Sequence, residues 1–281
     1  MGGTHAFRSN LFAAEPAKRI STSIVAAIHL QLILILIITF FICLKNTYTN
    51  HMTASEIILQ LQSLENEKTK EGMKRFAIAN DNALGINLPT MRNLAKEYKK
   101  LPNRHLIALE LWQSNIHEAM ILASMIEDAN LVTPQQMDDW TNTFYSWDLC
   151  DQTCCNLFQK TNFFLDKAFE YSHAQEEFVK RTGFVLMVQY VVHHKKADDN
   201  LCLQFLKRIE EEAWDERNFV KKALNWCLRQ IGKRNVYLHP IAIASAERIA
   251  LQNTKSAKWI AADALRELHS EAVVKRVKEK Q

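Results

Sequence analysis

The sequence is poor in glycine and proline, with six glycines and five prolines among its 281 residues. Sheet proteins ordinarily need more turn residues than this, and no stretch shows the sustained apolar and polar alternation of strands. Dinucleotide-binding fingerprints and phosphate-binding loops are also excluded, because both depend on closely spaced glycines. The scarcity therefore favours a helical protein without a nucleotide-binding loop.

Cysteine is scarce as well, and six cysteines in the whole chain exclude a disulfide scaffold. Cys150, Cys154 and Cys155 lie close together, but their spacing does not make a tetrahedral zinc site and no matching pair follows. His117 and Glu118 lack the second histidine of a zinc-protease helix. We therefore expect buried thiols, no metal and no organic cofactor.

The net charge of +4 is unevenly distributed along the chain. Residues 1–51 carry +3, and residues 52–216 carry 17 basic and 25 acidic side chains. Residues 217–281 carry 14 basic and 5 acidic side chains. A cationic last part of this kind is compatible with a nucleic-acid partner.

One long apolar run lies near the N-terminus, where residues 24–44 carry no formal charge. As a helix of about 32 Å this run could cross a bilayer. Residues 52–281 contain no glycosylation sequon, and Met52 precedes a capping box of Thr53 and Glu56. We predict a folded cytosolic domain over residues 52–281, preceded by residues 1–51 as either a dispensable leader or a real membrane anchor.

Helical spacing of apolar residues runs through the whole of the second part. Thr133 and Pro134, for example, predict a helix N-cap followed by proline at the first helical position. The predicted helices cover residues 53–65, 67–78, 90–100, 103–113, 115–128, 133–146, 148–158, 163–172, 175–193, 198–212, 216–232, 236–251 and 255–268. Paired helices at a pitch of about 35–45 residues favour an all-α fold, a curved α-solenoid, with a compact helical domain as the alternative.

Two segments carry candidate functional residues, and the first covers residues 146–151. Trp147 and Asp151 are four residues apart, so on a helix they share one face. A tryptophan ring beside a carboxylate suits a cationic ligand. The structural alternative is that Trp147 belongs to the core and that Asp148 and Asp151 are helix caps.

The second segment covers residues 215–235, where a tryptophan lies among three cations. Lys222, Trp226, Arg229 and Lys233 recur at intervals of four, three and four residues and form one stripe, with Phe219 among the packing residues. A basic and aromatic stripe can contact phosphates and stack on a base or sugar. A solvated face, with the tryptophan covered by lysine stems, explains the spacing equally well.

Three motifs together resemble the DNA alkylation repair glycosylases, the AlkD-like family. Residues 218–235 look like the late signature of that family, residues 146–151 like its earlier signature, and residues 84–96 like its N-terminal motif. The motifs occur in the family's order, and the resemblance spans roughly residues 53–270 without residues 1–51. The resemblance implies a curved solenoid of HEAT-like helical repeats with a cationic concave face.

The resemblance also implies roles for individual side chains. Trp147 and Asp151 match a tryptophan and an aspartate that meet the lesion, and Trp226 matches a second tryptophan. Arg181 matches an arginine that touches the DNA backbone near the lesion. Arg229 would grip phosphates as well, with Lys222 and Lys233 extending the phosphate track.

The implied activity is that of a DNA glycosylase that excises cationic N3- and N7-alkylated purines from duplex DNA. Asp151 would stabilise the oxocarbenium-like sugar as the N-glycosidic bond breaks. We expect a monomer in the cytoplasm, associated with the nucleoid, and with a single transmembrane segment only if residues 24–44 are a real anchor. Two other hypotheses are a helical-repeat protein that binds damaged or branched DNA without cutting it, and a protein-interaction scaffold.

Overall fold

A computed structural model describes residues 31–39, 52–78 and 81–280 of the chain, which divides into two units, residues 1–51 and 52–281. In the first unit, residues 31–39 form a helix. No helix among the described residues is both long and apolar enough to span a membrane. The predicted segment over residues 24–44 lies mostly outside the described residues, so the choice between a leader and an anchor stays a prediction.

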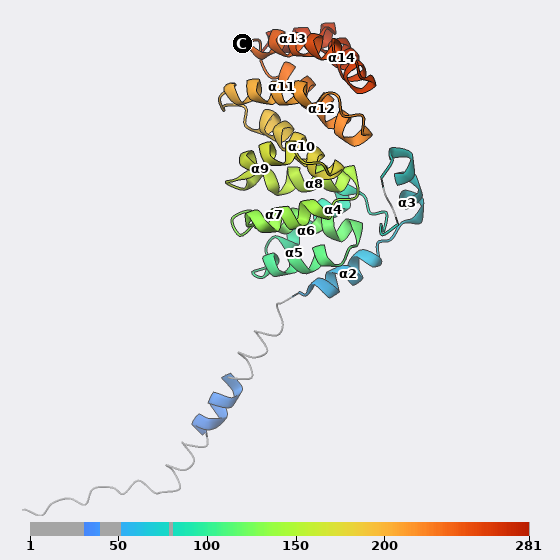
Figure 1. Cartoon of the computed structure of the whole chain (residues 1–281). Coiled ribbons are helices and arrows are strands. Elements are labelled where there is room, and N and C mark those ends of the chain that lie inside the picture. Colours follow the sequence, from blue (N-terminus) through green and yellow to red (C-terminus); the bar gives the residue numbers. More distant parts are fainter. Residues whose placement is uncertain (1–30, 40–51, 79–80, 281) are drawn as a thin grey trace, which may run out of the picture. The chain divides into compact units, whose positions relative to one another are not determined.

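The second unit is built from helices, and its described residues contain no strand (Figure 1). The first half of the unit contains α2 (Ala54–Gln62), α3 (Glu67–Met73), the short 3-10 helix η1 (Lys74–Phe76), α4 (Leu88–Tyr98), α5 (Arg104–Gln113), α6 (His117–Ile126), α7 (Pro134–Asn142) and α8 (Trp147–Asn156). The second half contains η2 (Phe158–Lys160), α9 (Phe164–Ser172), α10 (Glu177–His193), α11 (Asn200–Glu212), α12 (Asn218–Gly232), α13 (Leu238–Ala250), α14 (Lys255–Leu268) and α15 (Glu271–Lys278).

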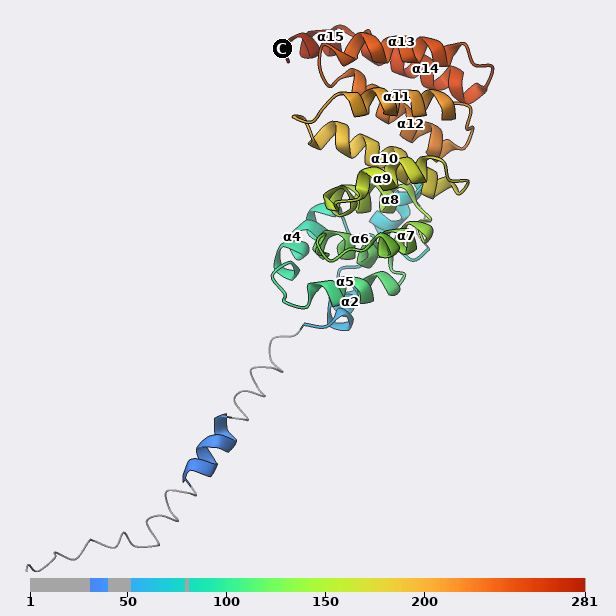
Figure 2. The same ribbon diagram turned by 60° about the vertical axis from the view of Figure 1, so that its left-hand side comes forward.

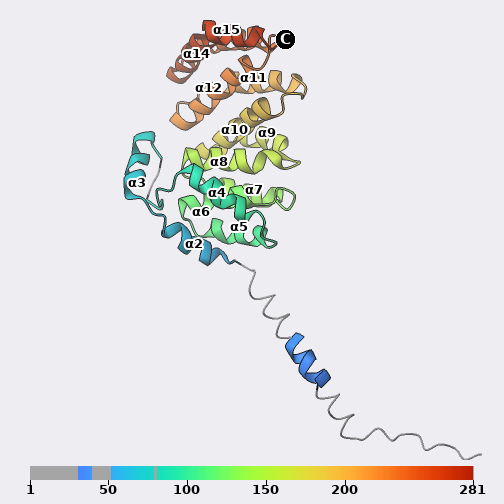
Figure 3. The same cartoon turned by 180° about the vertical axis from the view of Figure 1, so that it is seen from behind.

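These helices are arranged in successive pairs along one direction (Figure 2). Helices α6, α8, α10, α12 and α14 pack one against the next and form one layer. Helices α5, α9 and α13 pack against α6, α10 and α14 from the other side (Figure 3). Each pair therefore contacts mainly its neighbours, which is the arrangement of an α-solenoid. The predicted all-α solenoid is confirmed over the compact alternative.

Local signals in the sequence mark several helix ends. The Thr53 backbone N–H donates to Glu56 Oε2 at 2.8 Å, and the Glu56 N–H donates to Thr53 Oγ1 at 3.3 Å, which completes the predicted capping box. Thr133 caps α7, and Pro134 occupies its first turn. Helix α14 begins and ends at the predicted residues. Helix α15 was not predicted, because only Val273 and Val277 are buried and one turn of spacing shows no periodicity.

The motif at residues 84–86 wraps around a buried carboxylate. The backbone N–H groups of Leu84, Gly85 and Ile86 donate to the Glu118 side chain at 2.7, 2.7 and 3.2 Å. Gly85 has a φ of +75°, and a Cβ there would lie 2.2 Å from the Asn66 carbonyl oxygen. Glycine is therefore required at this turn. The bonds fix the entry to α4 against α6.

Helix α10 runs through the middle of the stack and approaches α9 very closely at Gly183. A Cβ on Gly183 would lie 2.4 Å from the backbone nitrogen of Ser172 and 2.8 Å from the carbonyl oxygen of Ala168. The missing side chain lets the two helix backbones come together. This contact lies half a turn after Arg181 and so fixes the position of that side chain.

Candidate functional site

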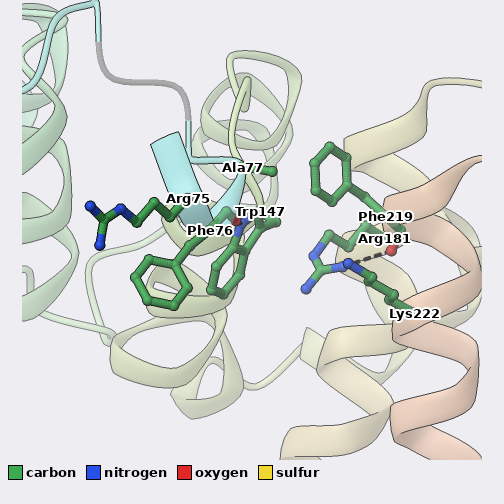
Figure 4. Close-up of a pocket in the computed structure, with 7 residues that line it drawn as sticks. All are labelled: Arg75, Phe76, Ala77, Trp147, Arg181, Phe219 and Lys222. Atoms are coloured by element: carbon green, nitrogen blue, oxygen red, sulfur yellow. Dashed lines mark hydrogen bonds between the residues drawn. The ribbon is translucent and has the colours of Figure 1, made fainter. Parts of the chain in front are cut away.

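A pocket of about 440 Å³ lies where four separate stretches of the second unit meet. Its lining includes Arg75 and Phe76 from η1, Trp147 from α8, Arg181 from α10, and Phe219 and Lys222 from α12. Figure 4 shows Phe76 and Trp147 on one side of the pocket, with Arg181, Phe219 and Lys222 on the other. The pocket thus combines aromatic walls with a cationic rim.

Trp147 forms one wall and is only half-buried, because it is the first residue of α8. Its Nε1–H donates to the carbonyl oxygen of Phe76 at 3.0 Å. The guanidinium of Arg181 lies 5.9 Å from the centre of its ring. The tryptophan is therefore a pocket residue, and the alternative that it belongs to the core is wrong.

Asp151 lies one turn after Trp147 on α8, and 15% of its side chain is exposed. Arg181 binds it through two parallel hydrogen bonds, from Nε to Oδ1 and from Nη2 to Oδ2, each 2.9 Å long. Arg181 also donates from Nη1 to the carbonyl oxygen of Phe219 at 2.6 Å. A paired fork of this kind fixes both side chains in orientation. Asp151 is not a helix cap.

Burial disfavours the charged form of Asp151. Burial raises the pKa of Asp151 above its ordinary value, and the neighbouring charge of Arg181 works against this shift. Asp148, also on α8, adds a smaller effect in the same direction as burial. A carboxylate in such a site interacts strongly with any positive charge that approaches it, since little water is present to screen it.

Arg181 is predicted to contact DNA, but most of its N–H groups are already bonded within the protein. Three of the five N–H groups of a guanidinium are used by Asp151 and Phe219. The side chain is also 94% buried, with 6% of its surface exposed. The structure therefore places Arg181 as the partner of Asp151, and its contact with a phosphate stays a prediction.

The predicted stripe on α12 divides into two parts. Lys222 is exposed at the pocket, while Trp226 is half-buried against the core. Arg229 and Lys233 both reach across to Glu267 on α14, with 2.5 Å between Lys233 Nζ and Glu267 Oε1. The structure brings only Lys222 of this stripe to the pocket lined by Trp147, and the DNA contacts of the other three stay predictions.

Two aromatic residues of the pocket were missed or misplaced by sequence reasoning. Phe219 was predicted to pack inward, but it is half-buried at the pocket and stacks on Phe178 with ring centres 5.5 Å apart. Val220 takes the buried position instead. Phe76 is 68% exposed and was not among the candidate residues, because a lone phenylalanine near the end of the helix predicted over residues 67–78 belongs to no motif.

His117 of α6 and Asp148 of α8 link the two helices. His117 is hydrogen-bonded through Nδ1 to Tyr145 Oη at 3.0 Å and through Nε2 to Asp148 Oδ2 at 2.8 Å. These bonds tie α6 to α8, so Asp148 is a link between helices. Cys150 and Cys154 are buried thiols as predicted, whereas Cys155 is only partly buried. In the part of the chain that the structure describes, no cluster of His, Cys, Asp or Glu could hold a metal ion.

Comparisons with known proteins bear on the family and the fold of the chain. The sequence model of a family described as DNA alkylation repair enzyme matches residues 57–268. An uncharacterized protein of Listeria innocua is 22% identical over 200 residues, which cover 70% of this chain and 87% of that protein. An uncharacterized protein of Listeria monocytogenes is 20% identical over the same shares.

One solved structure has the same fold. It is described as a new family of proteins related to the HEAT-like repeat DNA glycosylases with affinity for branched DNA structures. It superposes with a TM-score of 0.63 at 18% identity, covering 77% of this chain and 95% of that chain. The helical stack is therefore a HEAT-like repeat fold, as the family resemblance implied.

Proposed function

The chain belongs to the DNA alkylation repair enzyme family, and from this we propose that it is a DNA glycosylase acting on cationic alkylpurines. The proposed substrates are purines alkylated at N3 or N7 in duplex DNA. The proposed reaction is hydrolysis of the N-glycosidic bond. The observation that carries the proposal is the Asp151–Arg181 pair, held beside Trp147 at an aromatic pocket with a cationic rim.

The pocket suits a planar cation joined to a polyanion. The ring of Trp147 can hold an alkylated base by cation–π contact, worth on the order of 1–2 kcal/mol when water is removed. Phe219 offers an apolar surface on the facing side of the pocket. Lys222 is exposed at the rim, where it can contact a phosphate of the same strand.

Asp151 would act at the sugar. Alkylation makes the base a cation, so the electron pair of the breaking C1′–N bond neutralises it and little acid catalysis is needed. The sugar gains positive charge as that bond breaks, and the carboxylate of Asp151 stabilises this charge. Water then adds its oxygen to C1′ and loses a proton to Asp151 or to solvent. Arg181 holds the carboxylate in one orientation before the reaction begins.

Selectivity would come from the charge of the lesion. Neither a deep base pocket nor a specific contact to one base edge is required when the leaving group itself is a cation. The full-length protein should release N7-methylguanine or N3-methyladenine from methylated duplex DNA faster than the spontaneous rate. Neutral alkyl adducts should be released more slowly. Chromatography of the released bases measures both, and release at the spontaneous rate from every methylated duplex would overturn the proposal.

The rate of base release at acid pH should depend on the Asp151–Arg181 pair. Base release should fall as pH is lowered through the pKa of Asp151, because only the ionised carboxylate stabilises the sugar cation. Since burial raises the pKa of Asp151, the fall should lie above the ordinary aspartate value of about 3.9. Replacing Arg181 with glutamine removes the charge that opposes this shift, so the fall should move to still higher pH.

Single-turnover base release measured across pH tests this expectation. Lys222→Gln is the matched control, because it removes a cation from the same pocket without touching the carboxylate. It should weaken DNA binding and leave the pH of the fall unchanged. A profile for Arg181→Gln that moves to lower pH, or that moves no further than the control, would contradict the role given to the pair.

A second candidate function is binding of damaged or branched DNA without base release. The observation that favours it is that both carboxylate oxygens of Asp151 are already engaged by Arg181. A solved structure of the same fold also carries a description of affinity for branched DNA. Binding that depends steeply on salt, together with release at the spontaneous rate, would select this function over the first.

A further inference from the structure

A second pocket, of about 640 Å³, lies at the opposite end of α12 from the aromatic pocket. Five cations line it: Lys195 follows α10, Lys233 and Arg234 follow α12, and Arg276 and Lys280 belong to α15 or follow it. We call this the basic pocket. Helix α15 lies beyond residues 57–268, so two of the five cations fall outside the part matched by the family.

Three of the five cations already have structural roles. Arg234 donates to the carbonyl oxygens of Val191, His194 and Ala197 at the end of α10, and its Nε binds Asp199 at 2.9 Å. Lys280 donates to the carbonyl oxygen of Lys233 at 2.6 Å, at the end of α12. Lys233 pairs with Glu267. Cations at the C-terminal ends of helices are stabilising in themselves.

Lys195 and Arg276 remain without such a role. Within residues 52–78 and 81–280, neither side chain has a hydrogen-bond or ion-pair partner. Both side chains are exposed, no acidic residue among those described lines the pocket with them, and the carboxylates of Asp199 and Glu267 are bound by Arg234 and Lys233. The basic pocket therefore holds a surplus of positive charge that the protein does not balance.

The cations also lie close enough to affect one another. Burial lowers the pKa of Lys280, and the charges of Arg276, Lys195, Lys233 and Arg234 lower it further. Mutual repulsion of this kind is relieved when an anion binds among the cations. An arginine fork is suited to a phosphate, with which it forms two parallel hydrogen bonds.

We propose that the basic pocket binds a phosphate of the DNA backbone, at a position separate from the aromatic pocket. Lys195 and Arg276 are the side chains that contact it. The proposal rests on the proposed function in one respect, that the ligand is DNA. Lys222 lies in the first half of α12 and Lys233 directly follows the helix, and their eleven residues of separation correspond to about 17 Å along it. One DNA duplex can therefore be held by both pockets at once.

The test measures the salt dependence of binding to an unmodified DNA duplex. For Lys195→Gln with Arg276→Gln, the slope of log affinity against log salt concentration should fall in magnitude by about 0.9, the contribution of the one phosphate contact that is lost. The matched control is Lys275→Gln with Lys278→Gln, which makes the same change of charge on exposed residues of α15 outside the pocket. The control should change the slope by much less.

Base release separates this inference from the proposed function. The control variant with Lys275→Gln and Lys278→Gln should release bases at the wild-type rate, because both side chains lie outside the two pockets. Wild-type protein that binds duplex without base release overturns the proposed function and leaves the inference standing if the slope falls as expected. An unchanged slope, or an equal change in the control, overturns the inference.

Discussion

Replacing Asp151 with asparagine should lower the rate of base release by about 10²–10³-fold, the effect of removing one preorganised charge-stabilising group. Asparagine has nearly the same size and can still accept one hydrogen bond from Arg181. It carries no negative charge, so the developing cation of the sugar loses its stabilisation. Affinity for DNA should stay near the wild-type value, because Asp151 is not a phosphate contact. Single-turnover release and equilibrium binding measure the two quantities separately.

The variant also weakens a buried ion pair, so stability has to be followed alongside activity. Asp138→Asn is the matched control, since Asp138 pairs with Lys167 at 2.6 Å between α7 and α9, away from the pocket. It removes the same charge from another pair between helices and should leave base release unchanged. Equal losses of binding and release in Asp151→Asn, or a release defect in Asp138→Asn, would refute the catalytic role of Asp151.

Replacing Gly183 with alanine should destabilise the second unit by about 3 kcal/mol, the upper end of the usual cost of overpacking. The added methyl group meets backbone atoms of Ser172 and Ala168, which cannot rotate away as a side chain would. For a domain of this size, about 2–4 °C of melting temperature is lost per kcal/mol, so the midpoint should fall by about 6–12 °C. Thermal unfolding followed by circular dichroism measures the change.

Gly72→Ala makes the same chemical change in another helix and serves as its control. A Cβ on Gly72 meets no atom within 4 Å. Alanine is favoured over glycine in a helix by up to about 1 kcal/mol, so this variant should be as stable as the wild type or slightly more so. If the Gly183→Ala protein has the same melting temperature as the Gly72→Ala protein, the packing of α9 on α10 does not depend on their close contact at Gly183.

The sequence predicts the fold well because the signals for it are local. Thr53 with Glu56 and Thr133 with Pro134 mark helix starts within four residues, and most helix bounds follow from spacing alone. Trp147 and Asp151 are predicted to share a face for the same reason. The short α15 lacks enough turns to show a pattern, which is why it escaped prediction.

The features of the site that the sequence did not predict depend on contacts between residues far apart in the chain. Trp147 meets the carbonyl oxygen of Phe76 across 71 positions, and Arg229 meets Glu267 across 38. Spacing within one helix contains no information on either contact. The resemblance to a family assigned Arg181 to the site, but its pairing with Asp151 follows only from the packing of α10 on α8.

The stretch that carries Phe76 is less buried than the helices that form the rest of the pocket. Neither α3 nor η1 contains a buried residue, so detaching them from the solenoid exposes little apolar surface. Local opening of such a stretch costs far less free energy than unfolding of the core. The hydrogen bond from Trp147 to the carbonyl oxygen of Phe76 then holds this stretch against the pocket, while Asp151 and Arg181 are bound to each other within the solenoid. Movement of this stretch would therefore open one wall of the pocket and leave the Asp151–Arg181 pair in place.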